Sequence, residues 1–386
     1  MSAAALCAPL VLTPAGFEID RCILFEGGRI VAVISASDCP AGVARRDLTG
    51  TLVPGFIDLQ VNGGGGVLFN DEPTVDGIAA IARAHRRFGT TGLLVTLISD
   101  ELEILARAIA AVDEAIEQGV PGVLGIHIEG PFLNPAKRGI HDASKFRTLD
   151  PAAIDLLSSL RCGRTLVTLA PERAPAGAVR ALTARGVVVA AGHTEATYEE
   201  VQASIEEGLS GFTHLFNAMT QLGSRAPGVV GAALDSRSSW CGIIVDGHHA
   251  HPAALRVALA AKGADRLALV TDAMPTVGSR DKEFWLGGQR IVAEHGRCAA
   301  PDGTLAGSDL DMVQAVRNAQ RLLGVDLATA VRMASSVPAS ALGMTGERGS
   351  IRPGLRADLV LLDENGKVLE TWIDGTSDRP AAAPAL

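Results

Sequence analysis

The stretch that decides the fold reads LLVTLI at residues 93–98, ELEILARAIAAVDEAIEQ at 101–118 and VLGIHI at 123–128. The first and third segments are short and almost wholly apolar, which predicts strands that are buried on both faces. The middle segment carries apolar residues at helical spacing. A strand, a helix and a second strand in this order predict two parallel strands joined by a helical crossover.

The same pattern recurs along most of the chain. Eight candidate strands share this short, β-branched and apolar character: 53–59, 93–98, 123–128, 166–170, 187–191, 212–214, 242–245 and 267–270. Ala-rich segments of helical period, such as 75–88, separate most of them. An open doubly wound sheet would predict a G-x-G-x-x-G fingerprint after the first strand, but residues 63–66 are a plain Gly run. The pattern therefore favours an α/β fold that closes into a (β/α)8 barrel of the TIM type.

The two ends of the chain have a different pattern. Segments 22–25 and 30–34 flank a Glu-Gly-Gly turn, and segments 358–362 and 368–373 flank a Glu-Asn-Gly turn. We expect both ends to form one small β-sandwich from residues 1–52 plus 345–386, beside a barrel from residues 53–344. Residues 277–304, with Gly287-Gly288 between short apolar runs, predict an inserted hairpin, and the Pro/Ala-rich tail 378–386 is expected to fray.

Composition narrows the functional classes. Hydrophobic residues make up 47 % of the 386 residues and charged residues 20 %, which supports a large core. The net charge is −9 and there is no Lys/Arg block, so nucleic-acid binding is disfavoured. No apolar stretch approaches about 18 residues, and the apolar start lacks the basic region of a secretory signal. Six cysteines without a C-x-x-C pattern indicate reduced thiols, so we expect a cytoplasmic protein without a membrane partner.

Polar residues stand where four of the expected strands end. Glu129, His193, His214 and Asp272 follow or end the third, fifth, sixth and eighth strands. In a barrel these positions meet at the carboxyl face, where functional groups gather. One Glu and two His suit a divalent metal such as zinc with a water in the remaining position, and a nearby Asp can take a proton from that water. A single His at a strand end is more often structural, so the hypothesis depends on the four occurring together.

Four motifs add a family resemblance. IHIEGPF at 126–132, AGHT at 191–194, THLFNAM at 213–219 and VTDAM at 270–274 together resemble the N-acetylglucosamine-6-phosphate deacetylases of the amidohydrolase superfamily. PGFID at 54–58 is similar to the superfamily's first barrel strand. GSIRPGLRADLVLLD at 349–363 is similar to its return to the β-sandwich. The resemblance spans nearly the whole chain, with the motifs in the expected order.

This resemblance implies a reaction and a set of site residues. The reaction is hydrolysis of the acetamide of N-acetyl-D-glucosamine 6-phosphate to D-glucosamine 6-phosphate and acetate. Glu129, His193 and His214 correspond to the metal ligands, Asp272 to the catalytic acid/base, and His141 to the histidine that contacts the acyl group. The positions that correspond to sugar and phosphate contacts are Asn217, Ala218, Arg225, His249, Leu305, Ala306 and Gly307. Part of the family's phosphate site comes from the neighbouring subunit, which implies a homodimer.

The sequence departs from the wider superfamily at the end of the first strand. Many amidohydrolases carry His-x-His there to hold a second metal, whereas this chain has Gln60 and Asn62. Amides are poor metal ligands beside imidazole, so we predict one metal ion per chain. Zinc suits the ligands best, and Fe²⁺ or Mn²⁺ are alternatives.

Three alternatives stay open at this point. A deacetylase of N-acetylgalactosamine 6-phosphate would differ in the orientation of one hydroxyl, and no residue separates the two. A hydrolase of cyclic amides or ureides is disfavoured by Gln60, Asn62 and Glu129. A non-catalytic barrel is disfavoured because all four site residues are present. Two further histidines receive structural interpretations: His85 is expected on a solvated helix face, and His127 in packing.

Overall fold

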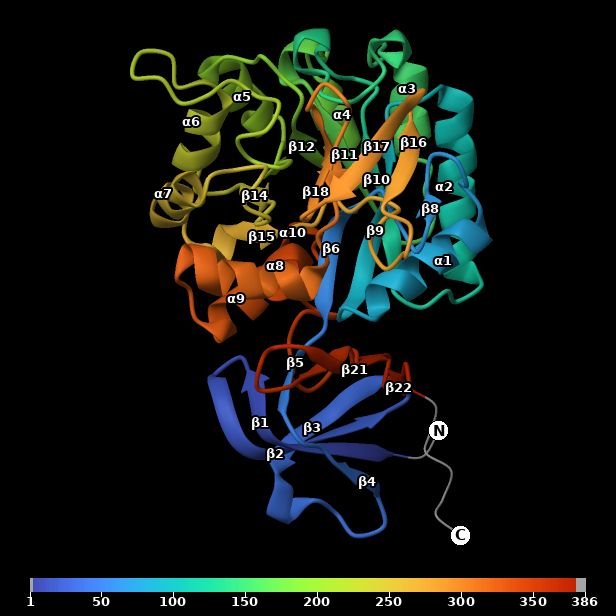
Figure 1. The fold of residues 1–386 in the computed structure, drawn as a ribbon, viewed down its shortest axis with the longest axis vertical. Helices are drawn as coiled ribbons and strands as arrows, with labels where there is room; N and C mark the ends of the chain where they lie inside the picture. Colours follow the sequence, from blue (N-terminus) through green and yellow to red (C-terminus); the bar gives the residue numbers. More distant parts are fainter. Residues whose placement is uncertain (1–2, 380–386) are drawn as a thin grey trace.

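The computed structural model describes residues 3–379, so the tail expected to fray lies largely outside the described residues. Figure 1 shows two parts, an α/β barrel and, below it, a sheet formed by both ends of the chain. Among the described residues, no helix is long and apolar enough to cross a membrane.

Eight parallel strands form the barrel, which confirms the predicted fold. In order around the sheet they are β6 (Phe56–Val61), β9 (Thr90–Ile98), β10 (Val123–Glu129), β11 (Arg164–Leu169), β12 (Val188–Ala191), β13 (Gly211–Phe212), β14 (Trp240–Ile243) and β15 (Leu267–Leu269). The two edges meet through a parallel bridge between Val61 and Ala273, and the Asp272 N–H donates to the Gln60 carbonyl at 3.0 Å. This closure brings the ends of the first and last strands together.

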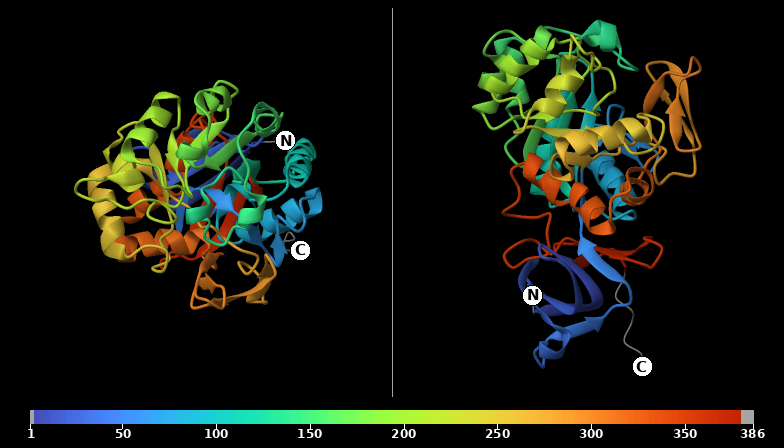
Figure 2. Two further views of the ribbon diagram at one scale, coloured as in Figure 1. Left: turned by 90° about the horizontal axis from the view of Figure 1, so that it is seen from above. Right: turned by 90° about the vertical axis from the view of Figure 1, so that its left-hand side faces the viewer.

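Helices cover the outside of the barrel, as Figure 2 shows from above. The longest, α2 (Leu102–Glu117), buries Leu105, Ile109 and Val112 at helical spacing against the strands. The other helices are α1 (Val75–Arg86), α3 (Pro151–Leu157), α4 (Ala178–Thr183), α5 (Tyr198–Glu206), α6 (Gly228–Asp235), α7 (Pro252–Lys262), α8 (Met312–Asn318), α9 (Leu327–Met333) and α10 (Ser336–Ala341).

Both chain ends contribute to one eight-stranded sheet, as expected. Its strands are β1 (Ala4–Thr13), β2 (Gly16–Glu26), β3 (Arg29–Ser35), β4 (Ala44–Asp47), β5 (Thr51–Pro54), β20 (Leu359–Leu362), β21 (Val368–Ile373) and β22 (Thr376–Ser377). Leu6 and Ile23 from the first end pack in one core with Leu359 and Trp372 from the other. The apolar alternation of the two ends therefore serves a shared interior.

The strand expected at 53–59 is divided between the two sheets. β5 pairs with β1 and β20, whereas β6 begins only at Phe56. Gly55 stands between them, and a Cβ there would lie 2.1 Å from the Thr91 hydroxyl. Only glycine allows the chain to pass β9 this closely on its way into the barrel. We therefore propose that the boundary between the two domains falls after Pro54 rather than at residue 52.

The segment expected as an inserted hairpin forms a four-stranded antiparallel sheet. Its strands are β16 (Glu283–Leu286), β17 (Gln289–Glu294), β18 (Arg297–Ala299) and β19 (Leu305–Ser308), and Gly287-Gly288 makes the first turn as predicted. Figure 2 shows this sheet standing at the side of the barrel. Ser308 accepts the Met274 N–H at 3.0 Å, so β19 is fixed to the rim beside Asp272. A second small hairpin, β7 (Gly63–Gly64) with β8 (Val67–Leu68), lies after β6.

The expectation that His85 lies on a solvated face is wrong. His85 is fully buried, and its Nε2–H donates to the Gly63 carbonyl at 2.9 Å. Burial lowers the pKa of His85 to about 4, so the ring is neutral. A Cβ on Gly64 would lie 2.8 Å from Nε2, which explains the Gly run: it leaves room for the imidazole under the loop. His127 is packed, as expected, and hydrogen-bonds Thr168 in the barrel interior.

The expectation of six free thiols is also wrong for two of them. Cys7 on β1 and Cys22 on β2 are joined as a disulfide, while Cys39, Cys162, Cys241 and Cys298 are free. The two residues face each other directly in the antiparallel ladder, where side chains approach most closely. A separation of 15 residues does not by itself indicate such a pairing.

Candidate metal centre and catalytic site

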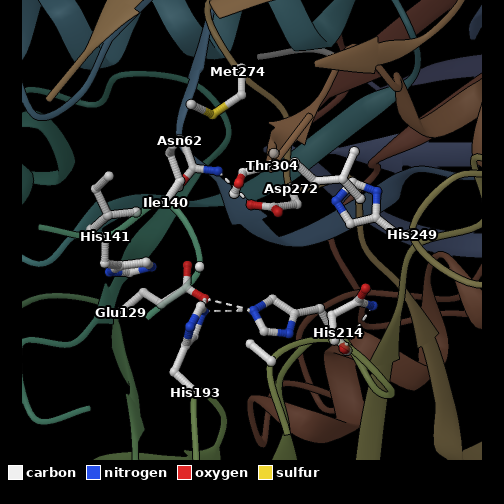
Figure 3. A pocket seen from close by; sticks show the side chains of 16 residues that line it. Asn62, Glu129, Ile140, His141, His193, His214, His249, Asp272, Met274 and Thr304 are labelled. Atoms are coloured by element: carbon white, nitrogen blue, oxygen red, sulfur yellow. Dashed lines mark hydrogen bonds and ion pairs between the residues drawn. The ribbon is translucent and has the colours of Figure 1, made fainter. Parts of the chain in front are cut away.

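Three of the four strand-end residues converge on one point. The Glu129 Oε1 atom lies 3.2 Å from His193 Nε2 and 3.0 Å from His214 Nε2, and the two Nε2 atoms lie 3.0 Å apart (Figure 3). All three residues are at most 5 % exposed. Ligand atoms at zinc distances of roughly 2.0–2.1 Å in a tetrahedron lie about 3.3 Å apart. The donor set therefore fits one small divalent cation.

The surroundings of this trio orient its donor atoms. His193 Nδ1–H donates to the Lys137 carbonyl at 2.8 Å, which leaves the Nε2 lone pair free for a metal. Burial alone would raise the pKa of Glu129, but the hydrogen bonds and charges of His193 and His214 lower it well below its usual range. The Glu129 carboxylate is therefore ionised, as a metal ligand must be.

The strand ends that carry the site adopt an unusual backbone. His193, His214 and Asp272 have φ values of 50°, 33° and 53°, and Ala218 has 49°. This left-handed region is disfavoured for residues with a Cβ and is concentrated at functional sites. At His193, His214 and Asp272 this turn comes two or three residues after the strand ends, and all three residues line the cavity.

Asp272 lies beside the trio, held by the amides of Gln60, near the end of β6, and Asn62, just after it. Its Oδ1 accepts from Asn62 Nδ2 at 2.6 Å and from Gln60 Nε2 at 3.1 Å. The same Gln60 nitrogen donates to Glu129 Oε2 at 3.0 Å. Gln60 and Asn62 therefore present protons to the carboxylates where a second metal would need lone pairs. Burial and the nearby charge of Glu129 raise the pKa of Asp272 to about 6.

Asp58 fixes the strand ends beneath Asp272, a role that the sequence did not reveal. Its carboxylate accepts the Thr271 hydroxyl at 2.5 Å and the backbone N–H groups of Gln60 and Thr271 at 3.2 Å each. Burial raises the pKa of Asp58 to about 7. The only sign in the sequence was its place in the PGFID segment of the first strand.

His141 faces the trio from the loop after β10, and Ser99 fixes its tautomer. The Ser99 N–H, which can only donate, lies 3.4 Å from His141 Nδ1, and the Ser99 hydroxyl lies 2.8 Å from it. Nδ1 is therefore the acceptor and the proton of the neutral ring is on Nε2. Burial and the neighbouring His193 lower the pKa of His141 to about 3. The ring is thus a neutral hydrogen-bond donor. Ser99 was missed, although it directly follows the strand at 93–98.

These groups surround a cavity of about 260 Å³. Of the predicted contact residues, the ones that line it are His141, Asn217, Ala218, His249, Leu305 and Gly307. Residues not foreseen as contacts also line it, namely Asn62, Ile98, Gly139, Ile140, Met274 and Thr304. Ala306 is fully buried behind the wall. Arg225 is not among the lining residues: it lies in the exposed loop 221–226.

Comparison with known proteins gives a consistent result. A family model described as "Amidohydrolase family" matches residues 51–377. An N-acetylgalactosamine-6-phosphate deacetylase of a Shewanella species is 46 % identical over 85 % of this chain and 83 % of its own. An N-acetylglucosamine-6-phosphate deacetylase of Haemophilus influenzae is 35 % identical over 92 % of this chain and 94 % of its own.

Among solved structures, a mutant N-acetyl-D-glucosamine-6-phosphate deacetylase of Mycobacterium smegmatis in complex with N-acetyl-D-glucosamine-6-phosphate superimposes with a TM-score of 0.89. It is 35 % identical, and the match covers 98 % of this chain and 99 % of that one.

Proposed function

Starting from membership of the amidohydrolase family, to which this chain belongs, we propose that it hydrolyses the acetamide of N-acetyl-D-glucosamine 6-phosphate to D-glucosamine 6-phosphate and acetate. The observation that carries the proposal is the convergence of Glu129, His193 and His214 beside Asp272 in one cavity. The galacto epimer is the second candidate, favoured by the similarity to the Shewanella deacetylase. A phosphorylated sugar is charged and stays within the cell, which supports a cytoplasmic location.

We propose that Glu129, His193 and His214 hold one divalent ion, with zinc suiting the ligands best and Fe²⁺ or Mn²⁺ as alternatives. When bound, such an ion supplies Lewis-acid polarisation of the acetamide carbonyl and a lower pKa for an attacking water. The amide protons of Gln60 and Asn62 support a single ion.

Asp272 is the proposed proton carrier. As a carboxylate it accepts the proton of the attacking water while a bond forms to the acetamide carbon. The bonds from Gln60 and Asn62 to Oδ1 hold the carboxylate, so that Oδ2 is the oxygen left to take the proton. Asp272 then gives the proton to the departing nitrogen, since an amide nitrogen leaves poorly as an anion.

His141 is the proposed donor to the developing oxyanion. Its Nε2–H is available because Ser99 occupies Nδ1, and the low pKa keeps the ring neutral rather than competing for the proton of Asp272. A preorganised donor of this kind typically contributes about 3–4 kcal/mol to transition-state stabilisation.

We propose that the sugar phosphate is held by Asn217, Ala218 and His249 of one subunit and Arg225 of the partner subunit in a homodimer. The first three line the cavity, whereas Arg225 is exposed outside it, which fits a residue that acts on a neighbouring chain. Leu305 and Gly307 line the sugar end, and Ala306 supports them from behind.

Arg225→Ala should raise KM for the phosphorylated substrate about 10- to 100-fold and leave kcat nearly unchanged, because it removes the proposed phosphate contact from a residue that lies outside the catalytic cavity. KM for unphosphorylated N-acetylglucosamine should not change. Arg237→Ala, another exposed arginine beyond the end of α6, is the matched control. Equal KM values for Arg225→Ala and Arg237→Ala would contradict the phosphate contact.

His141→Ala should lower kcat about 10²- to 10³-fold, the loss expected for one oxyanion donor, with little change in metal content. Ser99→Ala should lower kcat by a smaller factor, because it removes the hydroxyl that lies 2.8 Å from Nδ1 but keeps the backbone N–H that donates to the same atom. The exposed His248, replaced by Ala, serves as the control. Unchanged kcat in His141→Ala would exclude the donor role.

The function itself is tested by acetate release from the two epimeric 6-phosphates, using protein whose metal content has been measured. We expect turnover of at least one epimer with about one ion per chain, and higher kcat/KM for the gluco form. A preference for the galacto form would select the second candidate. No acetate from either substrate at full metal content would refute both.

A further inference from the structure

The small sheet contains a second cluster of reactive side chains, far from the barrel site. The sulfur atoms of Cys7, Cys22 and Cys39 all lie within 4.8 Å of one another. Cys7 and Cys22 form the disulfide, and Cys39 is a free thiol next to it. Cys39 follows a short helical turn, Ala36–Asp38, that connects β3 toward β4.

The disulfide itself is inaccessible to solutes. Cys7 is 3 % exposed and Cys22 is fully buried. Cys22 is flanked in the sheet by Cys7 on β1 and Ile34 on β3, and Cys7 is flanked on its other side by Asp47 on β4. A thiol from solution can attack the bond directly only after the sheet opens.

The segment that covers this face of the sheet carries Cys39. Ala36, Cys39 and Val43 pack against the cluster that contains Cys7 and Cys22. Cys39 is a partly exposed residue whose sulfur lies within 4.8 Å of both sulfurs of the buried pair. The guanidinium of Arg45, whose pKa is raised first by Asp47 and further by Cys39, lies near this thiol.

We propose that these three cysteines form a thiol–disulfide exchange site for low-molecular-weight thiols, with Cys39 as the entry thiol. The Cys39 thiolate attacks one sulfur of the pair: a bond to Cys39 forms, the Cys7–Cys22 bond breaks, and the other sulfur leaves as a thiolate. An external thiolate then attacks the Cys39 sulfur, forms a mixed disulfide there and releases the second buried thiolate. A further external thiolate attacks the small-molecule sulfur, releases the external disulfide and restores Cys39.

The test follows reduction of the oxidised, folded protein by glutathione, with the thiols trapped by rapid alkylation and mapped by peptide mass spectrometry. In the wild type we expect Cys7 and Cys22 to become alkylated together, with a glutathione adduct on Cys39 trapped on the way. Cys39→Ser should slow the reduction at least about tenfold. Cys162→Ser, which removes the other partly exposed thiol, should not change it.

A second arm avoids any effect of substitution on folding. Oxidised Cys162→Ser protein is alkylated at Cys39 with a small reagent after it has folded, and its reduction should slow as in Cys39→Ser. Acetate release should stay at the wild-type rate in both proteins, which shows that the fold is intact. Equal reduction rates with and without a free Cys39 would overturn the proposal. So would oxidised protein without a Cys7–Cys22 bond, or reduced protein that holds one thiophilic metal ion on the three sulfurs.

Discussion

Asp272→Asn should lower kcat by about 10³- to 10⁴-fold while the protein keeps its metal. The reason is that an amide cannot accept a proton from water or return it to the leaving nitrogen, and a positioned acid/base typically contributes up to about 10⁴-fold. Asn is nearly the same shape, and its carbonyl oxygen can still accept from Asn62 and Gln60. The measurements are kcat, metal content and thermal stability on the same preparation.

Two comparisons isolate the proton transfer. In the wild type, activity should decline as the pH falls through the pKa of Asp272, because the protonated carboxyl cannot act as the base. That pKa is about 6 in the metal-free cavity, and a bound cation would lower it. Asp281→Asn changes an exposed carboxylate on the inserted segment and should leave both rate and pH profile unchanged. Turnover of Asp272→Asn within a few-fold of wild type would remove Asp272 from the mechanism.

His214→Ala should abolish both tight metal binding and turnover. Its Nε2 lies 3.0 Å from each of the other two proposed donor atoms, so its loss leaves two ligands for an ion that needs three from the protein. We expect metal affinity to fall by more than about 100-fold, since even an outer hydrogen-bond partner is worth 10- to 100-fold. Metal analysis after dialysis and a chelator titration measure this directly.

His127→Gln is the matched control for a buried histidine of the same barrel. His127 hydrogen-bonds Thr168 and lies outside the proposed ligand set, so this variant should keep its metal even if it loses stability. Wild-type protein stripped by a chelator should regain activity with one equivalent of metal. Two tightly bound ions per chain would contradict the single-ion prediction, and full activity in the stripped protein would contradict the metal centre itself.

The site could be predicted from the sequence to the extent that it depends on strand ends. Parallel strands in a closed barrel finish on one face, so Glu129, His193, His214 and Asp272 meet once the strands are assigned correctly. Ser99 and Asp58 were not foreseen because their importance depends on register, that is, on which atoms a neighbouring strand places opposite them. Hydrophobic pattern fixes the presence of a strand but not the hydrogen bonds at its end.

The other misses have one physical cause, contacts between distant segments. The helical pattern around His85 is that of a surface helix, and only the Gly run at 63–66 allows the imidazole to be buried under a loop. Cys7 and Cys22 become neighbours only through the pairing of β1 with β2. In both cases the local pattern was interpreted correctly, but the surroundings of the side chain were decided by a contact with another segment of the chain.

The left-handed backbone at His193, His214 and Asp272 has a consequence for engineering. Each residue in this conformation costs on the order of 1–2 kcal/mol relative to a relaxed backbone. Together the three residues lower the free energy of unfolding, which is small in any folded protein. Glycine at any of these positions would relieve the backbone strain, but it would also remove a side chain on which the proposed reaction depends. A screen for thermal stability alone would therefore select inactive variants. A variant that is both more stable and active has to gain its stability in the outer helices or the terminal sheet, with these three turns unchanged.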